Sequence, residues 1–147
     1  MFKIDETKAT GKLTVEIKDK DGKVKDSREV KNLVVSDGLD FIASRMKDAT
    51  ATAMSHMAIG TGSTAAAAGN TALGSEAGRV ALTSTTVTDN AVAYVASFPA
   101  GTGTGAITEA GLLNASSSGT LLCRTVFSVI NKASGDTLGI TWTVTVS

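Results

Sequence analysis

The sequence predicts an all-β domain, either a β-sandwich or a jelly-roll-like barrel, that carries one short α-helix. Seven or eight short segments are rich in β-branched residues or alternate apolar with polar residues, which is typical of strands. Turn residues separate these segments at intervals of about 8 to 12 residues, the spacing found in all-β sandwiches and barrels. Only one segment has apolar residues at helical spacing. We expect a charged N-terminal arm or hairpin at 1–31 and a β-sandwich domain at 32–147, with a strand order that the sequence leaves open.

Residues 12–31 predict a β-hairpin. Leu13, Val15 and Ile17 alternate with polar residues, a pattern that indicates a strand with one wet face. The segment 19–22 ends in Asp-Gly, a strong hairpin-turn signal. Its acidic residues also hint at calcium, but the further ligands of a calcium loop are missing, so we interpret it as a turn.

One helix is expected at about 38–47. Ser36 or Asp37 is the candidate N-cap, and Asp40 adds negative charge to the first turn. Apolar residues follow at helical spacing, and we expect them to pack on a sheet: Leu39, Ile42, Ala43 and Met46.

The rest of the chain predicts strands joined by loops. We expect strands at 56–59, 80–87, 92–98, 106–113, 121–130 and 138–146, with a loop of small residues at 63–78 that includes a short helical turn near 73–76. The last strand alternates most regularly, which places Trp142 at the centre of a buried face. The expected core residues are Trp142, Ile140, Val144, Phe127 and Tyr94.

Charge is distributed very unevenly. Of the 28 charged side chains, 21 lie in the first 50 residues, and the last 97 residues carry only seven. An ordinary soluble domain is about 25% charged, so a long charge-poor segment favours packing against copies of itself or a partner. The threonine side of the last strand suits such burial. Net charge is zero and no apolar stretch reaches 18 residues, so we expect neither a nucleic-acid nor a membrane partner.

Few residues offer chemistry. His56 is the only histidine, and Cys123 is the only cysteine and lies in an apolar run. The glycine-containing segments at 60–63 and 101–105 lack the partners of phosphate-binding loops. We therefore expect no catalytic residues, no cofactor, no metal and no enzymatic activity; Cys123 is interpreted as a buried hydrophobe and His56 as a hydrogen-bonded structural residue.

Two pairs of charges stand out in the charge-poor region. Glu109 and Arg124 each interrupt an apolar strand, and Glu76 and Arg79 lie three residues apart. Unpaired buried charges are costly, so we interpret both pairs as structural ion pairs. A carboxylate acting as acid or base is the alternative, but no second carboxylate or histidine lies nearby in sequence.

The order of motifs from Asn32 to the C-terminus resembles small structural proteins of tailed bacteriophages. The matching segments are Leu33-Val34-Val35, Gly38-Leu39-Asp40-Phe41-Ile42-Ala43-Ser44-Arg45, Met57-Ala58-Ile59-Gly60-Thr61-Gly62, Thr71-Ala72-Leu73-Gly74-Ser75-Glu76 with Arg79, Ile107-Thr108-Glu109-Ala110-Gly111-Leu112-Leu113, Leu121-Leu122-Cys123-Arg124-Thr125 and Leu138-Gly139-Ile140-Thr141-Trp142-Thr143-Val144. The charged hairpin before Asn32 falls outside the pattern.

Proteins with this pattern are capsid decoration (cement) proteins or components of tail fibres and tail tips. The resemblance implies a virion part without catalysis. We expect a decoration protein that binds the outer surface of an icosahedral shell, contacts the major capsid protein and forms a homo-oligomer, with a trimer favoured. The alternative is a tail-fibre, tail-tip or connector component that contacts tail proteins and takes part in host adhesion. Long fibres usually show repeats or heptads, and none is present.

Overall fold

The fold is a single curled antiparallel sheet with one helix at its end, seen in a computed structural model that describes residues 9–46 and 51–146. The expected all-β class with one short helix is confirmed. The elements are β1 (Ala9–Lys18), β2 (Val24–Val34), α1 (Ser36–Arg45), β3 (His56–Gly60), β4 (Glu76–Ala81), β5 (Ser84–Thr88), β6 (Ala91–Phe98), β7 (Gly105–Leu113), β8 (Leu121–Lys132) and β9 (Thr137–Val146). The strand order is β4-β3-β7-β8-β2-β1-β9-β6-β5.

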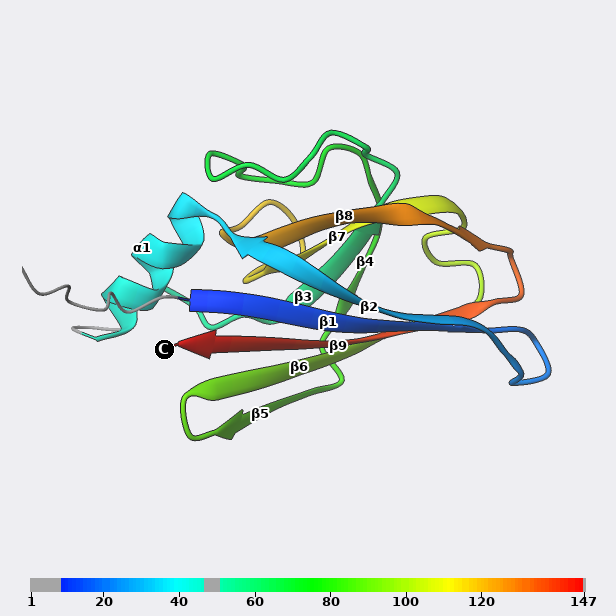
Figure 1. Ribbon diagram of the computed structural model, residues 1–147, viewed down its shortest axis with the longest axis horizontal. Coiled ribbons are helices and arrows are strands. Elements are labelled where there is room, and N and C mark those ends of the chain that lie inside the picture. The colour runs from blue at the N-terminus through cyan, green and yellow to red at the C-terminus, as the bar shows by residue number, and fades with distance from the viewer. Residues whose placement is uncertain (1–8, 47–50, 147) are drawn as a thin grey trace, which may run out of the picture.

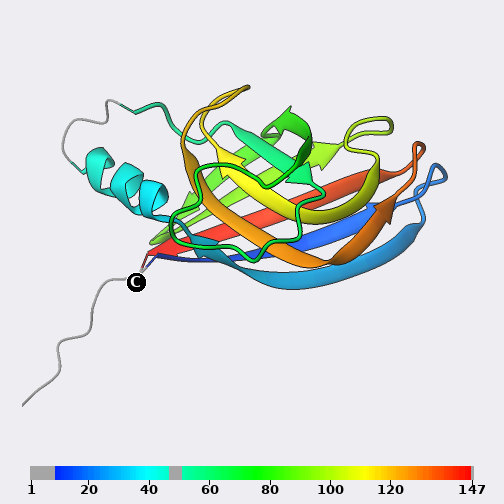
Figure 2. The ribbon, with the colours of Figure 1, turned by 90° about the horizontal axis from the view of Figure 1, so that it is seen from above.

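The sheet curls until its two halves face each other, as Figures 1 and 2 show. One layer is β2-β1-β9-β6-β5 and the other is β4-β3-β7-β8. Strand β2 joins them, because it pairs with β1 along its length but with β8 only through Leu33↔Arg124 and Val34↔Cys123. The result resembles a β-sandwich with one continuous side.

The core fills the space between the two layers. Trp142, Ile140, Val144 and Tyr94 are buried there, as expected, with Trp142 fully inaccessible. Phe127 is a correction, since it is only partly buried at the edge of the core. It lies in a bulge of β8, where residues 127–129 oppose a single residue of β7 and the inward–outward alternation is interrupted.

The N-terminal hairpin belongs to the β-domain, which corrects the expected boundary between 31 and 32 for the described residues. Strand β1 pairs with β9 from Ala9↔Val146 to Lys18↔Thr137. Its alternating residues Leu13, Val15 and Ile17 lie in the common core. The expected turn is present, and the Asp19 carboxylate accepts hydrogen bonds from the backbone N–H groups of residues 21 and 23, at 2.9 and 3.0 Å.

Helix α1 begins earlier than expected and presents a different face. Its N-cap is Val35, without a side-chain cap, so neither Ser36 nor Asp37 holds that position. A Cβ atom on Gly38 would lie 2.1 Å from the backbone oxygen of Leu122, so the helix backbone lies directly on β8. The inward face is therefore centred on Gly38, with partly buried Phe41 and Ile42 against the core. Of the expected stripe, only Ile42 packs inward, while three residues are exposed: Leu39, Ala43 and Met46.

Two further expectations are corrected around β4. The segment 80–87 is not one strand: residues 80–81 end β4 and residues 84–87 begin β5, because Leu82 and Thr83 cross from one layer to the other. Their N–H groups donate to the carbonyls of Ser55 and Val95, at 2.9 and 2.7 Å. The segment 73–76 forms no helical turn; residues 71–75 are irregular and β4 starts at Glu76.

Candidate interaction surface

A buried ion pair joins β7 to β8. Arg124 Nη2 lies 2.9 Å from Glu109 Oε1, and Arg124 Nε donates to the same oxygen at 3.0 Å. Glu109 is fully buried and Arg124 is 2% exposed. The structure thus brings together the first pair expected from the sequence, and its burial means that neither charge could remain alone without a large cost.

Glu109 also holds a long loop against the sheet. Its carboxylate accepts hydrogen bonds from the backbone N–H groups of Gly62, Gly74 and Ser75 at 2.6 to 2.7 Å. Burial alone raises the pKa of Glu109, but these amides and the Arg124 guanidinium outweigh it and hold the pKa below its ordinary value. A general acid needs the opposite shift, so the carboxylate is suited to binding the loop rather than to donating a proton.

Arg124 also binds the same loop, through two further hydrogen bonds. Its Nη1 donates to Asn70 Oδ1 and its Nη2 to the carbonyl of Thr64, both at 3.0 Å. The loop also approaches closely at Gly62, where a Cβ atom would lie 2.3 Å from Glu109 Oε2. Residues 61–75 are therefore held by a buried charged centre, although the loop itself has no regular structure.

The second expected pair lies within the edge strand β4 and reaches the loop between β7 and β8. Arg79 donates to both carboxylate oxygens of Glu76, with Nη2–Oε1 at 2.7 Å and Nε–Oε2 at 3.0 Å. Arg79 Nη1 also donates to the carbonyls of Ala115 and Ser118, at 2.8 and 2.9 Å. The pair thus holds the β7–β8 connection beside β4, but its exposed carboxylate limits what it adds to stability.

A third group of charged residues, which the sequence did not predict, consists of Lys25, Lys132 and Asp136. Asp136, 4% exposed, accepts a hydrogen bond from Lys25 at 2.6 Å, and Lys132, 2% exposed, donates to the carbonyl of Pro99 at 2.9 Å. Burial lowers the pKa of Lys132, and the nearby Asp136 charge opposes that shift. Lys132 and Asp136 are two of the few charges in the charge-poor region, and that was the one sign of their burial in the sequence. The N-terminal hairpin was expected to be a separate arm, so Lys25 was not expected as their partner.

The two residues considered for nucleophilic chemistry occupy structural positions. His56 Nδ1 is 2.8 Å from the Ser55 hydroxyl. Cys123 is fully buried, and burial raises the pKa of its thiol. Among residues 9–46 and 51–146 there is no group of three or more His, Cys, Asp or Glu side chains placed to hold a metal ion. Within the same residues, no helix is long and apolar enough to cross a membrane.

The outward-facing residues of strands β5, β6 and β9 that are paired with one another carry no charge. We call the surface that they form the uncharged face; its residues are Ser84, Thr86, Thr88, Ala91, Ala93, Val95, Ser97, Gly139, Thr141, Thr143 and Thr145. They form rows across the strands, as in Thr86↔Ala93↔Thr143. Charged side chains normally protect exposed sheets and their edges from association, and these strand positions have none.

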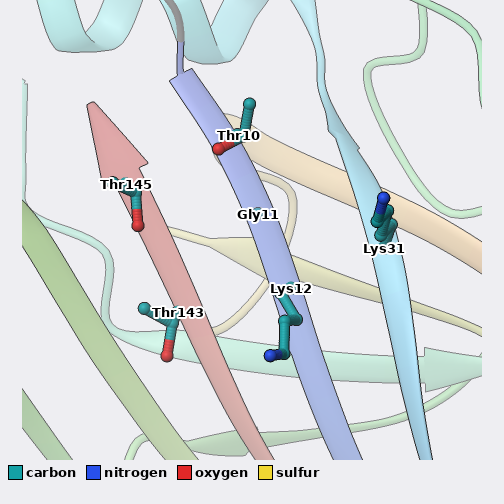
Figure 3. Close-up of a pocket in the computed structure, with 6 residues that line it drawn as sticks. All are labelled: Thr10, Gly11, Lys12, Lys31, Thr143 and Thr145. Carbon is teal, nitrogen blue, oxygen red and sulfur yellow. The ribbon is translucent and has the colours of Figure 1, made fainter. Parts of the chain in front are cut away.

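Charged residues are present on the next strand of the layer, β1, and on β2. The row continues from Thr143 to Lys12 and Lys31, and Lys12 pairs with Glu29 at 3.0 Å. The surface is hollowed at this boundary over about 530 Å³, lined by Thr10, Gly11, Lys12, Lys31, Thr143 and Thr145. Figure 3 shows the two lysines on one side of the hollow and the threonines of β9 on the other.

The uncharged face ends in an open strand edge. Strand β5 pairs with β6, and no other strand among the described residues pairs with it. All five of its residues are exposed and none is charged. The edge therefore offers unused backbone hydrogen-bonding groups beside an uncharged surface, the arrangement that permits sheet extension or close packing by a partner.

Comparison with protein-family models, curated proteins and solved structures finds no match to this chain.

Proposed function

We propose that this protein is a non-enzymatic virion structural protein, a capsid decoration (cement) protein that binds the outside of an icosahedral phage shell and stabilises it. The observation that carries the proposal is the uncharged face with its open β5 edge. A decoration protein adds buried interface to a shell without chemistry, and it needs a broad surface that gains by leaving water.

The motif resemblance to tailed-phage structural proteins supports the same proposal. Several of its motifs occupy positions that fix the shape of the domain: Glu109, Arg124 and the Thr71–Glu76 segment meet at the buried ion pair. A part that must resist mechanical load benefits from loops held by such contacts, because side chains that are fully hydrogen-bonded restrict local opening.

The decoration role also includes self-association, with a trimer favoured. The oligomer is proposed to bind the major capsid protein of the shell, and the virion is the proposed location. The uncharged face and the β5 edge are the surfaces proposed for these contacts, whereas the β1–β2 half, with its paired charges, is proposed to face solvent.

The proposal is tested by adding one charge to either half of the same layer. Thr86→Lys and Thr141→Lys place a lysine at exposed positions of the uncharged face, and Ser27→Lys places one at an exposed position of the charged half. Desolvating an unpaired charge in an interface is costly, so the first two variants should lose oligomerisation in sedimentation and binding to capsids that lack the protein.

The control variant Ser27→Lys should sediment and bind like the unaltered protein. Equal behaviour of all three variants would exclude the uncharged face as the contact surface. A protein that sediments as a monomer at high micromolar concentration would count against the oligomer. Binding to tails instead of shells would favour the fibre, tail-tip or connector role.

A further inference from the structure

The two edge strands of the sheet differ in how they are protected. Strand β4 carries the Glu76–Arg79 ion pair, and Arg79 also binds the β7–β8 connection. The backbone of Gly103 lies against the same strand, since a Cβ atom on Gly78 would be 2.9 Å from its nitrogen. Strand β5 forms the lower border of its layer in Figure 1, and all five of its residues are exposed and uncharged. Charge and cover hinder the addition of a strand at β4, whereas β5 permits it.

The sequence of β5 suits pairing with a second copy of itself. When two β5 strands pair antiparallel about Thr86, Ser84 lies opposite Thr88 and Thr85 lies opposite Val87. Every pair on the outward side then joins two hydroxyl side chains, Thr86 with Thr86 and Ser84 with Thr88. Cross-strand Thr–Thr and Thr–Ser pairs stabilise neighbouring strands, so the edge is complementary to itself.

The same pairing covers an exposed apolar side chain on the inner side. Val87 is 70% exposed and lies at the rim of an apolar groove of about 380 Å³ between α1 and strands β6 and β9. In the pair, Val87 of each copy lies beside Thr85 of the other, which removes part of its surface from water. The nearest charged residue in the sequence, Asp89, lies opposite Thr83, so no like charges meet.

We propose that β5 of one copy pairs antiparallel with β5 of a second copy across a two-fold axis at Thr86. Head-to-tail addition of β5 to β4 would bring the uncharged edge against the Glu76–Arg79 pair, and it would also extend into open filaments. The two-fold contact closes after two copies. Because its axis runs through the sheet, the outward side chains stay on one side, and the uncharged face continues across both copies.

The contact is short, with five residues from each copy. It is smaller than a standard stable interface, so we expect it to be weak between isolated copies and stronger where copies are held side by side. A two-fold pair does not complete a trimer. On a shell it joins a copy in one trimer to a copy in the next, and in this respect the inference rests on the proposed decoration role.

Disulfide trapping in the isolated full-length protein tests the contact. Thr86→Cys places one thiol per copy at the proposed axis, and the matched control Thr141→Cys places one on the same uncharged face, two strands away. Opposite Cβ atoms of paired strands lie about 4.5 to 5.5 Å apart, close to the span of a disulfide. Cys123 is fully buried and does not compete. Under mild oxidation, Thr86→Cys should form linked dimers at least about tenfold faster than Thr141→Cys.

A second set of variants tests the register. Thr85→Cys and Val87→Cys lie opposite each other in the proposed pair, so a mixture of the two should form linked dimers several-fold faster than either variant alone. Single variants that link as fast as the mixture would overturn the register centred on Thr86. Equal rates for Thr86→Cys and Thr141→Cys would overturn the edge contact itself.

These rates are measured without shells, so the edge contact and the decoration role fail separately. Rapid linking of Thr86→Cys in a protein that does not bind capsids would support the β5 contact and count against the decoration role. Capsid binding without rapid linking of Thr86→Cys would overturn the β5 contact and leave the decoration role standing.

Discussion

Glu109 and Arg124 lie on neighbouring strands, 2.9 Å apart, with almost no solvent access to either side chain. The pair differs from an ordinary salt bridge because each partner also binds backbone or side-chain groups of the 61–75 loop. The two residues therefore connect the sheet, the loop and each other through one buried network.

Removing one member of this pair should be strongly destabilising. Glu109→Ala or Arg124→Ala leaves a buried charge without its partner, and we expect each to reduce the free energy of unfolding by about 3 to 5 kcal/mol. Denaturant unfolding of the single and double variants forms a double-mutant cycle. The free energy of unfolding should fall much less in the double variant than the sum of the decreases in the two single variants. Additive decreases would disprove the coupling.

The same pair predicts a loss of stability in acid. Because the folded state lowers the pKa of Glu109, its ionised form stabilises the fold above the unfolded value of about 4.3, and this contribution is lost as the pH falls toward the lower folded-state pKa. The difference in unfolding free energy between the unaltered protein and Glu109→Gln should therefore shrink as the pH is lowered from 6 toward that range. Glu76→Gln, at an exposed carboxylate, should show a small difference at every pH. If the difference in unfolding free energy between the unaltered protein and Glu109→Gln stayed constant in acid, the prediction would be contradicted.

Trp142 should report a dry core. It is the only tryptophan, and it is fully buried between the layers. Its native fluorescence should be blue-shifted and resist quenching by iodide, and Trp142→Ala should cost about 3 to 5 kcal/mol. Phe127→Ala serves as the comparison and should cost less, since Phe127 is only partly buried. A red-shifted, readily quenched emission would show that the two faces of β9 are assigned the wrong way round.

Gly38→Ala separates helix propensity from helix packing. Propensity alone would make alanine more favourable by about 1 kcal/mol. The added Cβ, however, would lie 2.1 Å from the backbone oxygen of Leu122, which cannot rotate away as a side chain could. We expect a net destabilisation of about 1 to 3 kcal/mol, measured by thermal or denaturant unfolding. The exposed Ala43 provides the control position, where Ala43→Gly should cost only the propensity difference. A more stable Gly38→Ala protein would mean that α1 does not rest on β8.

The sequence predicted those features that depend on neighbouring residues. Alternation in 138–146 identified the buried side of β9, and Asp-Gly identified the hairpin turn, because both signals are local. The pairing of Glu109 with Arg124 could also be anticipated, since two opposite charges in apolar strands have few other partners. The backbone donors of the 61–75 loop could not, because their direction depends on how that loop folds over the sheet.

The corrected features depend on contacts between distant residues. Strand β1 enters the domain because its partner is β9, at the opposite end of the chain. The segment 80–87 divides because the chain changes layer at Leu82 and Thr83, and Phe127 is partly exposed because β8 bulges there. The face of α1 is decided by the close approach of Gly38 to β8, and apolar spacing within the helix cannot indicate that.

The copy number of the protein in purified virions tests the proposed decoration role most directly. The proposal implies that a phage encodes the protein, and quantitative mass spectrometry of that phage's particles would compare peptides of this protein with those of the major capsid protein. An icosahedral shell repeats each surface site by symmetry, so the proposal predicts on the order of hundreds of copies per particle. A handful of copies would contradict the decoration role and favour the tail component, and absence from the virion would contradict both.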